Sequence, residues 1–327
     1  MRSNSTAWTV VLAGGEGSRL KELTTTDAGE VVPKQFCSLE RSTCLLEDAL
    51  NRARAVASQD RICTVVAQQH QHWWRKVLTG LLPENVFVQP HNRGTANGIL
   101  LALLQIERRD PDAVVTLLPE DHYVADEGVM ARALRVATSL AVAEQNLVFL
   151  LGAEPDHADE ELGYIVPSSR PAGGAAGVSR FAEKPSMAQA RELIKAGALW
   201  NTFILAGSVR SLLSLYEGFD STLEAMRSAI DVAQSEVVGA ADLDVLYQDL
   251  KSCDFSRDVL ERHEQVLQVL RVPPCGWTDL GTPKRLEEAI RELGQLRAGP
   301  LAMSAGSGKP FLDLAYCYRR RWLLQAS

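Results

Sequence analysis

The sequence predicts an α/β protein with an open, mostly parallel sheet flanked by helices. Short apolar runs rich in valine and isoleucine alternate with segments of helical period. These runs contain few polar positions, as is typical of parallel strands that are buried on both faces. The 327 residues are enough for one large domain or two ordinary ones with a substantial core.

The alternating elements follow one another through the first half of the chain. The expected strands are Trp8–Ala13, Arg61–Ala67, Asn85–Gln89, Asp112–Pro119 and Asn146–Gly152. The expected helices between them are Ser42–Ala57, Gln69–Leu81, Gly94–Arg109 and Gly128–Gln145. Because open parallel sheets bind ligands at the carboxyl ends of their strands, we expect a site where these strands end.

The pattern changes in the second half of the chain. Strand-like segments at Tyr164–Pro167 and Val178–Pro185 flank a loop containing PAGGAAG, and helices follow. A strand returns at Glu264–Val272, and WTDLGTP leads into a helix at about Pro283–Leu296. Residues 298–327 begin with small residues and end in an amphipathic segment, which we interpret as a solvated or partner-docking tail.

Composition and charge exclude several classes of protein. The net charge is −7, so we expect no nucleic-acid partner held by a general basic surface, and an anionic ligand needs locally placed cations. The six cysteines form neither a CxxC pair nor a zinc-site spacing, which favours free thiols in a reducing cytosol. With no signal peptide or membrane-length apolar stretch, we expect a cytoplasmic protein without a membrane partner.

A glycine-rich loop follows the first expected strand. Gly14, Gly15 and Gly17 have no Cβ, so backbone N–H groups can approach a phosphate chain closely. Arg19 can add a fork of hydrogen-bond donors, and Lys34 a compact positive charge. Taken alone, the loop is equally compatible with a glycine turn flanked by solvated cations.

Several motifs together resemble those of the sugar-1-phosphate nucleotidyltransferases. The loop GGEGSRL and the later Pro33-Lys34 match the family's G-G-x-G-x-R-L and P-K signature, and PKQF resembles the mannose-1-phosphate guanylyltransferase branch. Further motifs follow in the family's order: QPHNRGTA, LPEDHY, LGYIVP, FAEKP, LWNTF, SCDF and WTDLGTP. The resemblance implies a Rossmann-like, GT-A-like nucleotidyltransferase domain at residues 1–297, with a small sugar-binding β insertion and a C-terminal tail at 298–327.

The resemblance also implies a reaction. GMP would pass from GTP to mannose 1-phosphate by in-line attack assisted by Mg²⁺, giving GDP-mannose and pyrophosphate. A phosphate monoester is mostly dianionic at pH 7, so the nucleophile needs no catalytic histidine. Repulsion between two polyanions instead calls for a divalent cation and fixed basic side chains. A homodimer is a family expectation.

The motifs assign roles to individual residues by resemblance. Catalytic roles on the triphosphate fall to Arg19 and Lys34. Nucleotide binding falls to Leu12, Ala13, Gly14, Gly15, Gly17, Gln89, Gly94 and Thr95. Sugar-phosphate binding falls to Gly163, Glu183, Lys184 and Asn201. Magnesium binding falls to Asp121 and Asp279, because hard oxygen ligands beside phosphates favour magnesium over zinc. A helix cap at Asp121, a turn at Asp279 and a solvated strand-end lysine at Lys184 are the structural alternatives.

Three other functions stay open at this point. The first is the same chemistry on another pair of nucleotide and sugar 1-phosphate. The second is a regulatory protein that binds a nucleotide sugar without turnover, although both aspartates and all three cations are present. The third is an NAD-dependent dehydrogenase, which is disfavoured because Leu20 occupies the third glycine position of a dinucleotide fingerprint.

Overall fold

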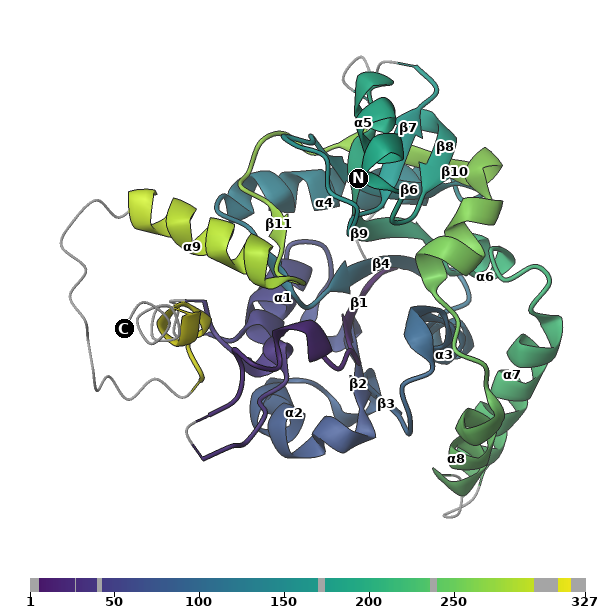
Figure 1. The fold of residues 1–327 in the computed structure, drawn as a ribbon. Helices are drawn as coiled ribbons and strands as arrows, with labels where there is room; N and C mark the ends of the chain where they lie inside the picture. Colours follow the sequence, from purple (N-terminus) through teal and green to yellow (C-terminus); the bar gives the residue numbers. More distant parts are fainter. Residues whose placement is uncertain are drawn as a thin grey trace.

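The computed structural model describes residues 6–26, 28–39, 43–169, 174–235, 240–296 and 311–318. Within these residues the chain forms a nine-stranded sheet in the order β3-β2-β1-β4-β9-β6-β10-β8-β7, with helices on both faces (Figure 1). The strands of this sheet are β1 (Ala7–Ala13), β2 (Ile62–Ala67), β3 (Val86–Gln89), β4 (Val114–Pro119), β6 (Val148–Ala153), β7 (Tyr164–Pro167), β8 (Ala176–Ala182), β9 (Leu199–Ser208) and β10 (Leu267–Arg271).

The strand directions confirm the predicted fold class. β1 pairs in parallel with β2 and β4, β2 with β3, and β6 with β10. Only β8 and β9 run against the other strands of this sheet in the described residues. β9 was not predicted as a strand, because we expected helices in this region. It lies antiparallel between β4 and β6 and thereby joins the two halves of the sheet.

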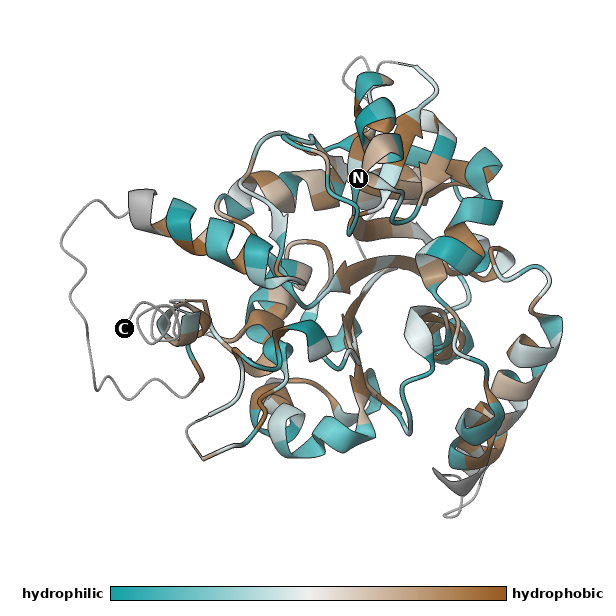
Figure 2. Ribbon diagram, in the orientation of Figure 1, coloured by the Kyte–Doolittle hydropathy of each residue, from teal (hydrophilic) through white to brown (hydrophobic). Residues whose placement is uncertain are grey.

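Helices cover the two faces of the sheet. They are α1 (Leu45–Ala53), α2 (Gln71–Val77), α3 (Gly94–Arg109), α4 (Glu127–Ala143), α5 (Met187–Lys195), α6 (Val209–Ser214), α7 (Asp220–Ser235), α8 (Ala240–Asp249) and α9 (Pro283–Leu296). α1 and α4 pack on one face, and α3 and α6 on the other. Neighbouring residues of β1 point to opposite faces, so Val11 joins the first core cluster and Val10 the second. Figure 2 shows these central strands as mainly hydrophobic.

The expected β insertion is a hairpin that extends the main sheet. β7 and β8 pair antiparallel, β8 also pairs with β10, and β7 also pairs with β9. Part of the PAGGAAG loop, residues 170–173, lies outside the described residues. A small hydrophobic cluster with Tyr164, Leu193 and Trp200 packs α5 against this hairpin. Because β7 pairs with β9 as well as with β8, the hairpin closes the part of the sheet made of β9, β6, β10, β8 and β7 on itself.

A second, two-stranded sheet lies beyond the end of β4. β5 (His122–Tyr123) pairs antiparallel with β11 (Thr278–Asp279). Asp279 is in register with His122, and the Leu280 N–H donates to the Asp121 carbonyl at 3.0 Å. α9 follows β11 and packs against it. This pairing brings the WTDLGTP motif to the loop after β4.

The part of the tail that the structure describes is not solvated, in contrast to the first of the two interpretations of its sequence. Residues 311–318 pack onto the domain, and Leu314 and Ala315 are fully buried in the first core cluster. Residues 298–310 and 319–327 lie outside the described residues. Cys37, Cys44 and Cys63 are buried free thiols, as expected. None of the described helices is long and apolar enough to span a bilayer.

Candidate active site

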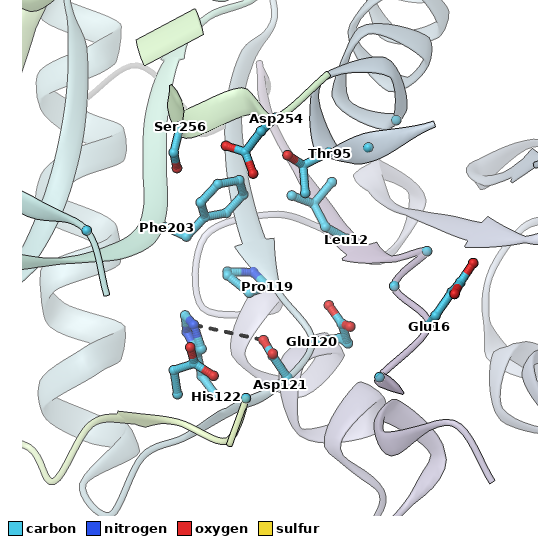
Figure 3. A pocket seen from close by; sticks show the side chains of 18 of the residues that line it. Leu12, Glu16, Thr95, Pro119, Glu120, Asp121, His122, Phe203, Asp254 and Ser256 are labelled. Atoms are coloured by element: carbon cyan, nitrogen blue, oxygen red, sulfur yellow. Dashed lines mark ion pairs between the residues drawn. The ribbon is translucent and has the colours of Figure 1, made fainter. Parts of the chain in front are cut away.

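A cavity of 510 Å³ opens where the predicted site was placed, at the carboxyl ends of β1 and β4 (Figure 3). Segments far apart in the chain line it, from the glycine loop to the residues after β11. The predicted residues that line it are Leu12, Gly14, Gly15, Gly17, Arg19, Lys34, Gln89, Gly94, Thr95, Asp121, Gly163, Glu183, Lys184, Asn201 and Asp279. Ala13, also predicted to bind the nucleotide, is fully buried and does not line the cavity.

Gln35 holds the glycine loop in place. Its Nε2 donates to the Gly15 carbonyl at 2.9 Å and to the Ala13 carbonyl at 3.3 Å. The side chain is fully buried, so these two bonds fix the backbone just where it leaves β1. The sequence motifs assigned Gln35 no role, although its place beside Lys34 in PKQF is the signal that could have found it.

The start of α3 forms another wall of the cavity. Gly94 has a φ of +83°, and a Cβ there would lie 2.2 Å from the Cys253 carbonyl oxygen, so this position requires glycine. Thr95 Oγ1 accepts a hydrogen bond from the Phe255 N–H at 2.8 Å. These contacts bring the SCDF motif against the QPHNRGTA motif. Ser252 and Asp254 therefore line the cavity, although the sequence motifs assigned neither residue a role.

Lys34 and Asp121 form a buried ion pair. Lys34 Nζ donates to Asp121 Oδ2, and the exposed fractions of the two side chains are 9% and 16%. Burial lowers the pKa of Lys34, but the neighbouring carboxylates, Asp121 foremost, outweigh burial and raise it. Burial raises the pKa of Asp121, but the groups around it, foremost Lys34 through its charge and its hydrogen bond, together outweigh burial and lower that pKa to about 2. Both side chains are therefore charged at neutral pH.

Glu120 places a further carboxyl group in the cavity. Figure 3 shows it between Asp121 and the glycine loop, and an added Cβ on Gly15 would lie 3.4 Å from Glu120 Oε1. Burial and the negative charge of Asp121 raise the pKa of Glu120 to about 8. Two adjacent carboxylates around one lysine cannot both ionise easily, so Asp121 takes the charge. Glu120 stands next to Asp121 in LPEDHY, but the motif assigned it no role.

Asp279 presents one carboxylate oxygen without a hydrogen-bond partner. Its Oδ2 accepts from Arg285 Nη2 at 3.2 Å, while Oδ1 is buried and unpaired among the described residues. The sequence predicts that Asp121 and Asp279 meet at one edge of a parallel sheet. The strands before them in the main sheet, β4 and β10, do run in the same direction. The two aspartates are brought together, however, by the pairing of β5 with β11. The described residues contain no cluster of three or more His, Cys, Asp or Glu suited to a metal ion.

Arg19 reaches the opposite side of the cavity. Its Nη1 donates to Glu161 Oε2 at 2.7 Å, and both side chains are about half exposed, at 48% and 47%. Glu161 lies in the loop before β7 and also lines the cavity. No motif in the sequence pointed to Glu161.

Glu183 and Asn201 face one another across Gly163. A Cβ on Gly163 would lie 2.6 Å from Glu183 Oε2 and 3.2 Å from Asn201 Cβ, so only glycine leaves room for both. Asn201 Oδ1 accepts from the Phe203 N–H at 2.9 Å, which orients the amide N–H groups away from that bond. Burial raises the pKa of Glu183, and the charge of Lys184 opposes this shift. Together the two side chains offer acceptors and donors of the kind that bind hydroxyl groups.

Lys184 adopts a strained backbone conformation. Its φ of +49° lies in the left-handed region, which costs a non-glycine residue on the order of 1–3 kcal/mol. The Lys184 ammonium is 3.5 Å from Glu183 Oε1, and the side chain is 38% exposed. Strain of this kind at a cavity wall is typical of a residue kept in place for binding.

His122 supports the loop that carries Asp121. Trp277 Nε1 donates to His122 Nδ1 at 3.2 Å, and the two rings pack edge to face. Burial lowers the pKa of His122 to about 4, so its ring is neutral at pH 7. Its Nε2 lies 4.0 Å from Asp121 Oδ1. The indole thus fixes the tautomer and orientation of the imidazole.

Known proteins resemble this chain over most of its length. Xanthan biosynthesis protein XanB of Xanthomonas campestris pv. campestris (strain B100) is 29% identical over 292 residues, or 88% of this chain and 60% of the relative. Mannose-1-phosphate guanylyltransferase of Escherichia coli (strain K12) is 29% identical over 298 residues, with the same two coverages of 88% and 60%. The chain therefore spans about 60% of the length of these curated relatives.

The fold and the family agree. The crystal structure of mannose-1-phosphate geranyltransferase from Thermus thermophilus matches with a TM-score of 0.73 and 26% identity, covering 87% of this chain and 79% of that one. A family model described as nucleotidyl transferase matches residues 8–295. Because this match spans most of the chain, and with it every residue that lines the cavity, the chain belongs to the nucleotidyl transferase family.

Proposed function

We propose that the chain transfers GMP from GTP to mannose 1-phosphate, with GDP-mannose and pyrophosphate as products. The observation that carries the proposal is one cavity with two separate sets of groups. Lys34 lies beside the glycine loop, while Lys184 lies beside the hydroxyl-binding groups Glu183 and Asn201. The similarity to proteins named mannose-1-phosphate guanylyltransferase supports GTP and mannose 1-phosphate as the pair.

In the proposed reaction, an oxygen of the sugar phosphate attacks the α-phosphorus of the triphosphate in line. A phosphorus–oxygen bond forms as the bond to the bridging oxygen breaks, and pyrophosphate leaves with that electron pair. Lys34 and Arg19 would offset the negative charge of the triphosphate, and Lys184 would hold the sugar phosphate. No group of the chain needs to remove a proton, because the nucleophile is mostly dianionic at neutral pH.

Asp121 and Asp279 fit the role of magnesium ligands. The unpaired Oδ1 of Asp279 and the charged carboxylate of Asp121 are hard oxygen donors beside the cavity. Bound Mg²⁺ would neutralise phosphate charge and orient the phosphate groups. With only two protein carboxylates, substrate oxygens and water would complete the shell. Gln35 would keep the glycine-loop backbone in position for the phosphates.

A pyrophosphate-release screen tests the function. Four nucleoside triphosphates are each paired with a panel of sugar 1-phosphates in the presence of Mg²⁺. We expect GTP with mannose 1-phosphate to give the highest kcat/KM. A higher kcat/KM for another pair would keep the reaction and replace the substrates. Calorimetric binding of GDP-mannose without pyrophosphate release from any pair would instead identify a regulatory protein that binds the nucleotide sugar.

A further inference from the structure

Residues 311–318 lie outside the family match at residues 8–295, yet they belong to the core. Leu314 and Ala315 are fully buried in the same cluster as Phe36 and Cys37. Asp313 Oδ1 accepts from the Ala315 and Tyr316 N–H groups at 3.0 and 3.1 Å, which caps a short helical turn. Figure 1 shows this yellow turn beside the purple N-terminal segment.

The segment 311–318 forms backbone hydrogen bonds on both sides of Ser38. The Ser38 N–H donates to the Leu312 carbonyl at 2.8 Å, and the Leu314 N–H donates to the Ser38 carbonyl at 2.9 Å. Ser38 is fully buried. Without the segment, a buried donor and a buried acceptor would lose their partners, and such losses are costly.

Ser38 follows a short turn that carries Lys34, which lines the cavity, and Gln35, which holds the glycine loop. The turn begins at Pro33, and the Phe36 and Cys37 N–H groups close it by bonding back to Pro33 and Lys34 at 2.9 Å each. From this turn Lys34 reaches Asp121, and Gln35 reaches the Gly15 carbonyl. The far end of the turn is tied to the segment 311–318. Displacement of Ser38 would therefore move the lysine and the glycine loop together.

We propose that the segment 311–318 positions Lys34 and Gln35 for nucleotidyl transfer, with Leu314 as the residue that anchors it. The proposal rests on the proposed function. Leu314 lines no part of the cavity. Its side chain packs in the core cluster of Phe36 and Cys37, and its backbone N–H bonds to the Ser38 carbonyl, so it can act on the site only through this turn. The segment lies outside the family match and far from the glycine loop in sequence. In the fold it is nevertheless linked to that loop through Ser38 and Gln35.

Kinetics of full-chain variants test the proposal. Leu314→Ala should lower kcat roughly 10- to 100-fold while KM for the sugar 1-phosphate stays within about twofold. A misplaced Lys34 would slow the transfer step, whereas the sugar phosphate would bind at another part of the cavity. Leu314→Met should restore kcat. Leu134→Ala removes an equally buried leucine of the same core cluster on α4 and should leave kcat unchanged. Equal losses of kcat in Leu314→Ala and Leu134→Ala would overturn the proposal.

A double variant separates positioning from general destabilisation. If Leu314 acts through Lys34, Leu314→Ala should add little to the loss in Lys34→Met, because residues that act as a unit are not additive. Additive losses would place the effect of Leu314 elsewhere. If Leu314→Ala does not fold, Leu314→Val, which removes less volume, takes its place in the same kinetic comparison.

Hydrogen exchange gives a readout that needs no turnover. Backbone amides of residues 34–39 should exchange faster in Leu314→Ala than in the unaltered chain, whereas those of β4 should not change. In Leu134→Ala, residues 34–39 should keep their protection. Unchanged exchange at 34–39 in Leu314→Ala would refute the anchoring. Faster exchange there, together with no pyrophosphate release by the unaltered chain, would support the anchoring and refute the proposed function.

Discussion

Arg19 and Glu161 join two walls of the cavity through an ion pair of 2.7 Å. Arg19 comes from the glycine loop after β1, and Glu161 from the loop before β7. Both side chains are about half exposed, so the pair contributes little to stability. The guanidinium can therefore exchange this carboxylate for a phosphate at low cost.

We predict that Arg19→Ala and Lys34→Ala lower kcat more than they raise KM for the sugar 1-phosphate. Both cations face the expected triphosphate, where charge changes during transfer, and loss of one such stabiliser costs on the order of 10²-fold in kcat. Steady-state kinetics with each substrate varied measures this. An unchanged kcat in both cation variants would identify the loop as a structural turn.

Glu161→Gln should instead lower KM for GTP about two- to fivefold, since it removes a weak competitor for Arg19.

Lys184→Ala is expected to raise KM for the sugar 1-phosphate about tenfold and to leave KM for GTP nearly unchanged. A charged hydrogen bond of this kind contributes about 1.5–3 kcal/mol when buried, and partial exposure places Lys184 at the low end. The matched control is Lys195→Ala, which removes an exposed lysine of α5 paired with Glu192. Equal increases in both KM values would place Lys184 away from the sugar phosphate.

We predict that His70 makes the free energy of unfolding depend on pH. Burial lowers its pKa below the usual value near 6.5, and its Nδ1 is buried without a partner in the described residues. The folded state therefore favours the neutral ring. The contribution of neutral His70 to the free energy of unfolding is complete above about pH 6.5. It is lost as the pH falls through the pKa that His70 has in the folded state.

Urea unfolding at a series of pH values between about 5 and 7.5 measures the effect. His70→Gln should flatten the fall in unfolding free energy at the acidic end, because glutamine does not titrate. His72→Gln, at an exposed neighbouring position, should leave the fall unchanged. The same slope in His70→Gln and the unaltered chain would show that other groups cause the pH dependence.

Much of the fold was predictable because β1, β2 and β4 are apolar runs buried on both faces. β9 was harder, since its LWNTFILAGS sequence contains polar Asn201 and Thr202 and a left-handed Phe203. Such residues interrupt the pattern of a buried strand. They are tolerated here because Thr202 Oγ1 bonds to the Leu151 carbonyl at 2.7 Å, a partner visible only in the fold.

The cavity was predictable where residues lie in recognisable motifs, but not where contacts join distant segments. Glu161 pairs with a residue 142 positions away, and Arg285 reaches Asp159 across 126 positions. Neither contact leaves a local pattern. The anchoring of Ser38 by Leu312 and Leu314 was missed for the same reason, because a terminal segment of mixed composition is most simply interpreted as solvated.

The last prediction is that Asp121 and Asp279 act on one magnesium ion. Replacement of either by Asn keeps the shape and removes a charge, so each variant should lose roughly 10²-fold or more in kcat. The double variant should be little worse than either single one, because the two carboxylates would act as a unit. Asp112→Asn changes an exposed aspartate before the opposite end of β4 and is the matched control.

The dependence of kcat on magnesium concentration distinguishes a shared site from two independent roles. In the single variants, the magnesium concentration for half-maximal activity should rise, since one carboxylate holds the ion more weakly than two. Asp121→Asn also leaves Lys34 without its buried partner, so its unfolding free energy should fall more than that of Asp279→Asn, in which Arg285 keeps its ion pair with Asp159. Thermal unfolding checks this second effect apart from turnover. Full activity of Asp279→Asn at ordinary magnesium would leave Asp121 as the only protein ligand, because the unpaired Oδ1 of Asp279 would then have no part in binding the ion.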